Sequence, residues 1–193
     1  LGLIIGFTFS MAIARYDLRQ TYEEAEANAI GTEFLRADLL PSKTAETIKG
    51  LLNEYLDQRI LFYSKQDQET AKQITKHTIA LENAMWDELL PVARTQSTPT
   101  IALAVSGMND VLNARGYTQA AWWNRIPTAA WWLMAAIAIA ANVLVGFGAR
   151  NFKPNVGLFM IFPTMIAIAF FLIADIDSPR GGVIRIDPRN LID

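Results

Sequence analysis

Apolar residues gather in three stretches of the chain and do not alternate with polar ones at short range. Residues 1–14 carry no charge, and neither do residues 128–149 and 155–174. At about 1.5 Å per residue, each of the two later stretches is about 30 Å long as a helix, which matches the hydrocarbon thickness of a bilayer. The pattern predicts two transmembrane helices there, joined by a tight loop at 150–154.

The first apolar stretch continues into charged sequence without a turn signal. As a helix, residues 1–14 would cover about 21 Å, which is shorter than a bilayer. From Tyr16 to Arg36 there is no Pro, and Gly31 is the single Gly. We therefore interpret residues 1–14 as a truncated transmembrane helix that continues as helix into water.

Residues 15–127 have the pattern of amphipathic helices. Apolar residues recur at helical spacing after Pro41, and a further helix is expected to end before Pro91. A last one is predicted to begin at Thr98, with Pro99 in the first turn, and to end at Gly116. Because nothing alternates with period two, we expect an all-α integral membrane protein, with long helices extending into a helical region at 15–127 and a C-terminal membrane hairpin.

Basic residues near the predicted spans set the expected orientation. One crossing followed by a hairpin places residues 15–127 and the tail at 175–193 on the same side. That side carries Arg15, Arg19, Arg125, Arg180, Arg185 and Arg189, whereas the loop carries Arg150 and Lys153. The positive-inside rule then makes the helical region of this multi-pass protein cytoplasmic. Four tryptophans resemble interfacial anchors: Trp122, Trp123, Trp131 and Trp132.

Composition argues against several classes of function. The 193 residues fit one domain, and a net charge of −2 argues against a nucleic-acid partner. There is no Cys, and no nucleophile–base pattern or phosphate-binding glycine loop, so we do not expect an enzyme. The apolar stretches contain no Asp, Glu, Lys or Arg, which disfavours an ion-coupled carrier.

Three groups of residues are candidate sites. In the first, Leu3, Phe7 and Ser10 share one helix face. Ordinary packing against neighbouring helices explains this spacing. A pore helix whose large apolar side chains form a constriction would also explain it.

The second group lies in EANAIGT at 26–32 and in the turn before it. Glu23 and Glu26 share one helix face with Ile30, and Asn28 shares another with Thr32. Gly31 would let another backbone approach closely. One interpretation is a hydrogen-bonded seam between helices, and the other is a polar wall lining a cytoplasmic vestibule, where Glu23, Glu24 and Glu26 could help to bind a cation.

The third group is Asp175 and Asp177, at the end of the last apolar helix. Carboxylates at a helix C-terminus are unfavourable unless a positive group compensates them. We expect Arg180 to do so, with Arg15 and Arg36 as further candidates. The alternative is a Ca²⁺ ion held by both carboxylates and by backbone carbonyls of the 178–182 turn.

Several motifs resemble known membrane families. Gly6 and Phe7, followed by Arg15, Tyr16 and Glu23, resemble the apolar neck of the bestrophin anion channels. The segments EANAIGTEFLRADLLP at 26–41 and DIDSPRGGVIRI at 175–186 resemble the bacterial bestrophin-like domain family of unknown function. The first resemblance places Leu3 and Phe7 at neck positions and Arg15 at the membrane edge.

The resemblance implies a homo-oligomeric, multi-pass protein of a bacterial inner membrane, in contact with lipid. It also implies an anion such as chloride as the permeant ion and a pore along the oligomer axis. It also implies an acidic calcium site after the last membrane helix. The alternative hypothesis is a non-conducting scaffold or accessory subunit that docks a protein partner through its cytoplasmic helices.

Overall fold

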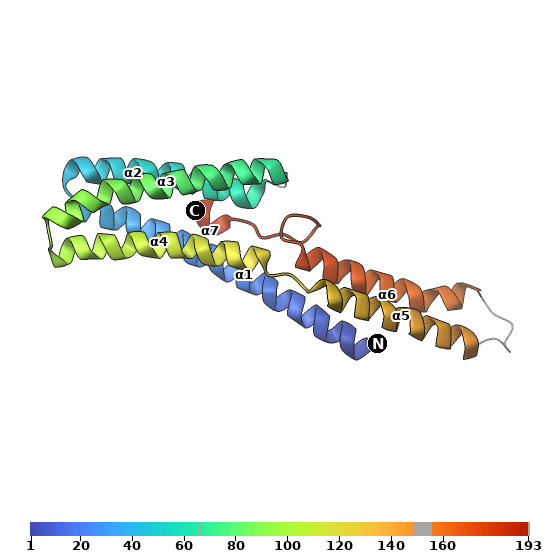
Figure 1. Cartoon of the computed structure of the whole chain (residues 1–193). Coiled ribbons are helices and arrows are strands. Elements are labelled where there is room, and N and C mark those ends of the chain that lie inside the picture. The colour runs from blue at the N-terminus through green and yellow to red at the C-terminus, as the bar shows by residue number, and fades with distance from the viewer. Residues whose placement is uncertain (66, 149–155, 193) are drawn as a thin grey trace. The chain divides into compact units, whose positions relative to one another are not determined.

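A computed structural model describes residues 1–65, 67–148 and 156–192. The described residues form helices and contain no strand, which confirms the all-α prediction (Figure 1). The predicted loop at 150–154, with Arg150 and Lys153, lies outside the described residues. In chain order the elements are α1 (Gly2–Arg36), η1 (Ala37–Leu39), α2 (Ser42–Ser64), α3 (Gln68–Thr95), α4 (Pro99–Trp123), α5 (Thr128–Gly148), α6 (Val156–Asp177) and α7 (Arg189–Ile192).

The chain divides into two compact units. The first unit comprises Leu1–Asp17 and Asn124–Arg185, and the second comprises Leu18–Trp123 and Ile186–Asp193. This division follows the apolar and polar parts of the sequence. The end of the predicted tail belongs to the second unit, because α7 is bonded there.

Helix α1 is one continuous helix of 35 residues that passes through Arg15 without a break. It ends at Arg36, and η1 leads into Pro41, in agreement with the predicted stop. One line of α1 side chains is buried, with members three, four or seven residues apart, as expected for a helix that packs along a single face. These side chains are Thr8, Ala12, Arg19, Glu23, Glu26, Ile30 and Glu33.

In the second unit, α2 and α3 run side by side as a hairpin, and α4 follows (Figure 1). Asp67 caps α3 by accepting a hydrogen bond from the backbone N–H of Thr70 at 2.7 Å. Thr98 accepts from the N–H of Ile101 at 3.2 Å, so α4 begins as predicted. The apolar core contains Ile48, Leu52, Tyr55, Phe62, Met85, Leu89, Met108 and Val111.

Two predicted helix ends are wrong. Helix α3 continues past Pro91 to Thr95, and the Thr95 hydroxyl donates to the carbonyl of Pro91 at 2.8 Å. Helix α4 continues past Gly116 to Trp123. A glycine in a helix costs about 1 kcal/mol, but the turns after Gly116 bury Thr118 and Trp122, and this burial outweighs the local preference.

In the first unit, a small apolar core lies among α1, α6 and the segment before α5. It consists of Ala12, Ile126, Ile173 and Ile176, with Ile5, Tyr16, Ala130 and Trp131 packed against it. Helices α5 and α6 are adjacent (Figure 1). Helix α5 matches the predicted 128–149 closely, and α6 extends the predicted 155–174 to Asp177.

Most of the apolar surface of α5 and α6 is exposed. Two helical stretches, Pro99–Gly148 and Phe159–Asp177, contain windows long and apolar enough to cross a membrane. Only 11% and 22% of these windows are buried, whereas the core helix of a water-soluble protein would be mostly buried.

The four tryptophans have different environments. Trp122 is buried in the second unit with its ring centroid 4.6 Å from that of Phe62, so it serves as a core residue. Trp131 packs edge-on against Phe170. Trp123 and Trp132 are exposed, as an interfacial anchor would be.

Two glycines of α4 should respond in opposite ways to alanine. No atom lies within 4 Å of a Cβ built at Gly116, so Gly116→Ala should stabilise the protein by about 0.5–1 kcal/mol. At Gly107 the same Cβ would lie 1.9 Å from Glu33 Oε2, so Gly107→Ala should destabilise it. Unfolding in detergent, followed by circular dichroism, measures both changes. Equal effects at the two positions would contradict the prediction.

Candidate functional site

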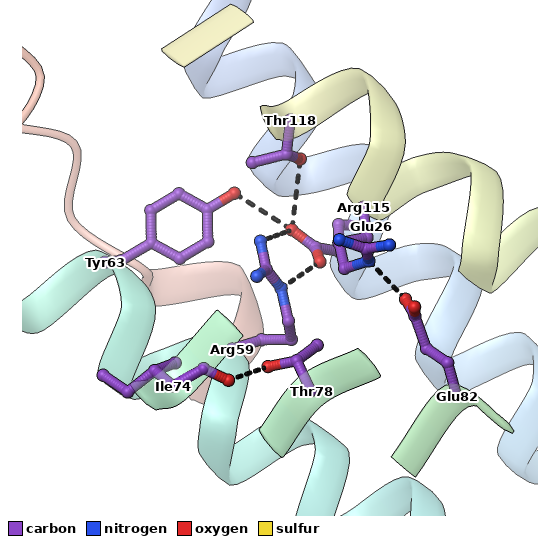
Figure 2. Close-up of polar contacts among 8 residues, drawn as sticks. All are labelled: Glu26, Arg59, Tyr63, Ile74, Thr78, Glu82, Arg115 and Thr118. Carbon is purple, nitrogen blue, oxygen red and sulfur yellow. Dashed lines mark hydrogen bonds and ion pairs between the residues drawn. The ribbon is translucent and has the colours of Figure 1, made fainter. Parts of the chain in front are cut away.

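The centre of the second unit is a buried carboxylate, Glu26 of α1. Arg59 of α2 donates to it through Nε to Oε1 and through Nη2 to Oε2, the latter at 3.2 Å. The hydroxyls of Tyr63 and Thr118 donate to Oε2 at 3.1 and 3.2 Å (Figure 2). Glu26 is fully buried and Arg59 is 2% exposed, so a desolvated ion pair joins α1 to α2, and the hydrogen bond from Thr118 adds α4.

Burial and the Glu26 carboxylate shift the pKa values of the groups around Glu26. Burial would lower the pKa of Arg59, but Glu26 outweighs it, and the pKa of Arg59 is raised. Burial, reinforced by the Glu26 carboxylate, raises the pKa of Tyr63 and Tyr55, which therefore remain neutral. The Arg59 guanidinium also lies 4.3 Å from the centre of the Phe62 ring.

A second ion pair joins α3 to α4. Arg115 donates through Nε to Oε1 of Glu82 (Figure 2). Burial raises the pKa of Glu82, and the charge of Arg115 opposes that rise. The pair is partly buried, because the side chain of Arg115 is 21% exposed.

Further along α1, Glu23 and Arg19 bond to other parts of the second unit. Glu23 Oε2 accepts from Asn190 Nδ2 at 2.6 Å, and its Oε1 accepts from the N–H of Leu191 at 3.3 Å. Arg19 donates to the carbonyl of Ala121 at 3.2 Å. Glu23 thereby holds α7 against α1.

These contacts place the polar residues of the second candidate group in two environments. Glu23 and Glu26 lie in a hydrogen-bonded seam between helices, where N–H and O–H donors surround their oxygens. Asn28 and Thr32 lie on another face of α1, which is exposed. Within the chain, the two pairs therefore do not line a common surface.

The predicted close contact at Gly31 is found at a different glycine, Gly107. No atom lies within 4 Å of a Cβ built at Gly31, so the expectation of a close backbone contact there is not met within the chain. The close approach occurs at Gly107 of α4, where the side chains of Glu33 and Arg36 take the space of a Cβ.

A pocket of about 230 Å³ lies beside the seam, between α1, α2 and α7. Its walls are mostly apolar, with two asparagines. It is lined by Ala27, Ile30, Gly31, Phe34, Leu52, Asn53, Leu56, Asn190 and Leu191.

In the first unit, Asp175 and Asp177 are bonded mainly to N–H groups. Asp175 accepts from the backbone N–H of Val183 and Ile184, each at 2.8 Å. The turn needs Gly182, whose φ is +97° and whose Cβ would lie 2.2 Å from Asp175 Oδ1. Asp175 therefore fixes the loop that follows α6.

Asp177 accepts from the N–H of Ile126 at 3.0 and 3.2 Å, and Arg15 lies 3.6 Å from its Oδ1. Arg15, one of the three arginines expected to compensate these carboxylates, is thus beside Asp177. Calcium requires several oxygen ligands, whereas N–H donors occupy both carboxylates, so the residues fit a structural role better than the predicted Ca²⁺ site. Among the described residues there is no cluster of three or more metal-ligating side chains.

The first candidate group, Leu3, Phe7 and Ser10, lies on the exposed face of α1. Leu3 is 72% and Phe7 is 66% exposed, and Ser10 is exposed beside them. The opposite face of the same turns packs against the apolar core through Ile5 and Ala12. Among the residues that the structure describes, the predicted constriction residues are thus left largely exposed.

Comparison with known families agrees with the resemblance of the segments at 26–41 and 175–186. The model of the Bestrophin-like domain matches residues 1–191. The chain belongs to the Bestrophin-like domain family. Searches of curated proteins and of solved structures found no match.

Sequence reasoning about this Bestrophin-like domain missed the partners of Glu26. Arg59 occupies the buried face of α2, four residues after Tyr55 and seven after Leu52. An arginine at a core position signals a buried acidic partner, so the need for a partner was predictable. Its identity was not, because α1 contains several glutamates.

Arg59→Met should strongly destabilise the protein. Removing one partner leaves Glu26 buried without its counter-charge, which typically costs about 3–5 kcal/mol. Unfolding in detergent measures the loss, and Glu26→Gln combined with Arg59→Met should recover part of it.

A matched control is Lys72→Met. Lys72 pairs with Glu69 on the surface of α3 at 3.1 Å, and its loss should cost about 0.5 kcal/mol or less. A cost at Arg59 as small as that at Lys72 would show that the buried ion pair does not hold the helices together.

Proposed function

We propose that this Bestrophin-like domain is a membrane protein that assembles as a homo-oligomeric ion channel, with α1 lining the pore. One observation carries the proposal. A continuous row of α1 residues, alternately four and three apart, is exposed along the whole helix. Its members are Leu3, Phe7, Ser10, Ala14, Asp17, Thr21, Glu24, Asn28, Gly31 and Leu35.

This spacing keeps residues on one helix face and, in oligomers, turns that face towards the partner helices. In a dry helical interface such positions are apolar, but here Ser10, Asp17, Thr21, Glu24 and Asn28 are polar. That composition favours a water-filled axis over a packed interface. Leu3 and Phe7, at the apolar end, would then form a narrow hydrophobic constriction, which can gate by dewetting.

The exposed apolar surface of α5 and α6 supports a position in lipid. Helices of this length and composition bury their side chains either in protein or in the bilayer, and the chain itself buries few of them. Two spanning helices and the apolar part of α1 cannot enclose a pore in one copy, so several copies are required. A bacterial inner membrane with the second unit in the cytoplasm remains part of the proposal.

Conductance in planar bilayers tests the constriction. Leu3→Ala and Phe7→Ala should each raise the single-channel conductance, because a shorter side chain widens and wets the constriction. Leu144→Ala and Phe171→Ala are matched controls, since these side chains are 71% and 62% exposed on α5 and α6. The controls should leave conductance unchanged.

The mass of the protein in detergent provides the second test. A ring of several 21.5 kDa copies agrees with the proposal. A monomer without conductance, or a hetero-complex, would instead favour the non-conducting scaffold that docks a partner.

The permeant ion has two candidates. The resemblance to bestrophin channels favours an anion such as chloride. The exposed charges of α1 favour a cation, because Asp17 and Glu24 are acidic and both belong to the exposed row. The arginines of α1 are engaged elsewhere: Arg15 lies beside Asp177, Arg19 donates to Ala121, and Arg36 lies beside Asp110.

Reversal potentials in a salt gradient separate the two candidates. Rings of carboxylates select cations, so a cation pathway predicts that Glu24→Gln combined with Asp17→Asn lowers the cation-to-anion permeability ratio. Glu54→Gln, which removes an exposed carboxylate on α2, should not change it. Anion selectivity that is unaffected by both sets of substitutions would assign the pathway to chloride-like ions.

A further inference from the structure

Glu33 is a buried carboxyl group that differs from the others in the second unit. It is fully buried near the end of α1, and neither of its oxygens has a hydrogen-bond partner among the residues that the structure describes. By contrast, Glu23 and Glu26 each accept at least two hydrogen bonds. A buried carboxylate without donors is strongly disfavoured, whereas the neutral acid is tolerated.

The contact that buries Glu33 explains why it has no partner. Its carboxyl group lies over Gly107 of α4, where a side chain would collide with Oε2. Arg36, one turn further along α1, lies against the same glycine, but its ion-pair partner is Asp110, at 3.7 Å. One arginine therefore faces two acidic groups, and it is paired with the one that is largely exposed.

The other charges around this end of α1 are already paired. Asp38 of η1 binds Lys49 of α2 at 2.6 Å, and the Lys49 ammonium lies 4.9 Å from the Phe34 ring centre. Burial raises the pKa of Glu33 to about 8, with Arg36 lowering it and Asp110 raising it further. At neutral pH the group is thus mostly protonated.

We propose that Glu33 is a proton-binding site that controls the contact between α1 and α4. In the protonated form, Glu33 rests on Gly107 while Arg36 pairs with Asp110. Loss of the proton creates a buried negative charge beside Arg36. Arg36 then leaves Asp110 and pairs with Glu33, or the charge draws water into the contact. This inference concerns packing within one chain and does not depend on the proposed pore.

Infrared difference spectroscopy of the full chain in detergent, below and above about pH 8, tests proton binding directly. The carbonyl band of a protonated carboxylic acid should be present at neutral pH and disappear as the pH rises. Glu33→Gln should abolish the band. Glu24→Gln, which removes an exposed carboxylate of the same helix, should keep it.

Thermal unfolding supplies a second readout. The folded carboxyl group has a pKa above the ordinary value of 4.5, so the folded state holds an extra proton between 4.5 and about 8. The stability that depends on this proton is complete below 4.5 and is lost as the pH rises towards 8. Glu33→Gln should therefore gain stability relative to the wild type as the pH increases through this window.

Asp110→Asn distinguishes a proton site from a merely buried residue. It leaves Glu33 as the carboxyl group closest to Arg36, so the infrared band should disappear at a pH lower by about 1 unit or more. Because Asp110 is exposed, this variant should fold even if Glu33→Gln does not. A wild-type protein without the band, a band that persists in Glu33→Gln, or a titration unchanged in Asp110→Asn would each overturn the proposal.

Discussion

The ion pair between Glu26 and Arg59 is the constraint on which the second unit depends. Desolvating two charges is costly, and the cost is offset only when the remaining donors and acceptors are satisfied. Tyr63 of α2 and Thr118 of α4 complete the bonds to Glu26, and the rings of Tyr63 and Phe62 pack against Trp122. The polar bonds fix the register of α1, α2 and α4, and the apolar contacts around them exclude water. A shift of α1 by one residue would break the whole set.

Helix α1 has two faces with opposite properties. Its buried face is bonded at almost every turn: Arg19 to α4, Glu23 to α7 and Glu26 to α2. Its other face is exposed among the described residues, although it carries a leucine at each end and Phe7 near the start. A helix that is tightly held on one side and open on the other can present a fixed row of side chains to other copies of the chain. The proposed pore rests on this asymmetry.

Within the buried face, Glu33 is the exception that gives α1 a chemical sensitivity. N–H and O–H donors surround the carboxylates of Glu23 and Glu26, whereas Glu33 faces the bare backbone of Gly107. A buried carboxyl group without hydrogen-bond donors favours its neutral form, so its environment controls whether it binds a proton. The contact between α1 and α4 is therefore the part of the second unit in which pH and packing are coupled.

The sequence alone determined the helical class, the continuity of α1 and the apolar lengths of α5 and α6. These features follow from spacing and composition, which act along the chain. It also indicated that carboxylates at the end of α6 need compensation, because helix ends carry a fixed polarity. Arg15 lies beside Asp177, whereas Asp175 accepts from backbone N–H groups. It predicted the wrong ends for α3 and α4. The local signal at Gly116 was outweighed by burial of Thr118 and Trp122. The turn after Pro91 is not buried, and there the Thr95 hydroxyl donates to the carbonyl of Pro91.

Only the tertiary structure decided which partners meet. Glu23, Glu26 and Glu33 are similar in sequence, yet one binds α7, one binds Arg59 and one binds no donor among the described residues. The partner of each glutamate depends on which residues of α2, α4 and α7 lie opposite that turn of α1. Those residues are more than twenty positions away along the chain. The exposure of Leu3 and Phe7 is likewise a tertiary property, because helical spacing identifies a shared face but not whether that face is covered.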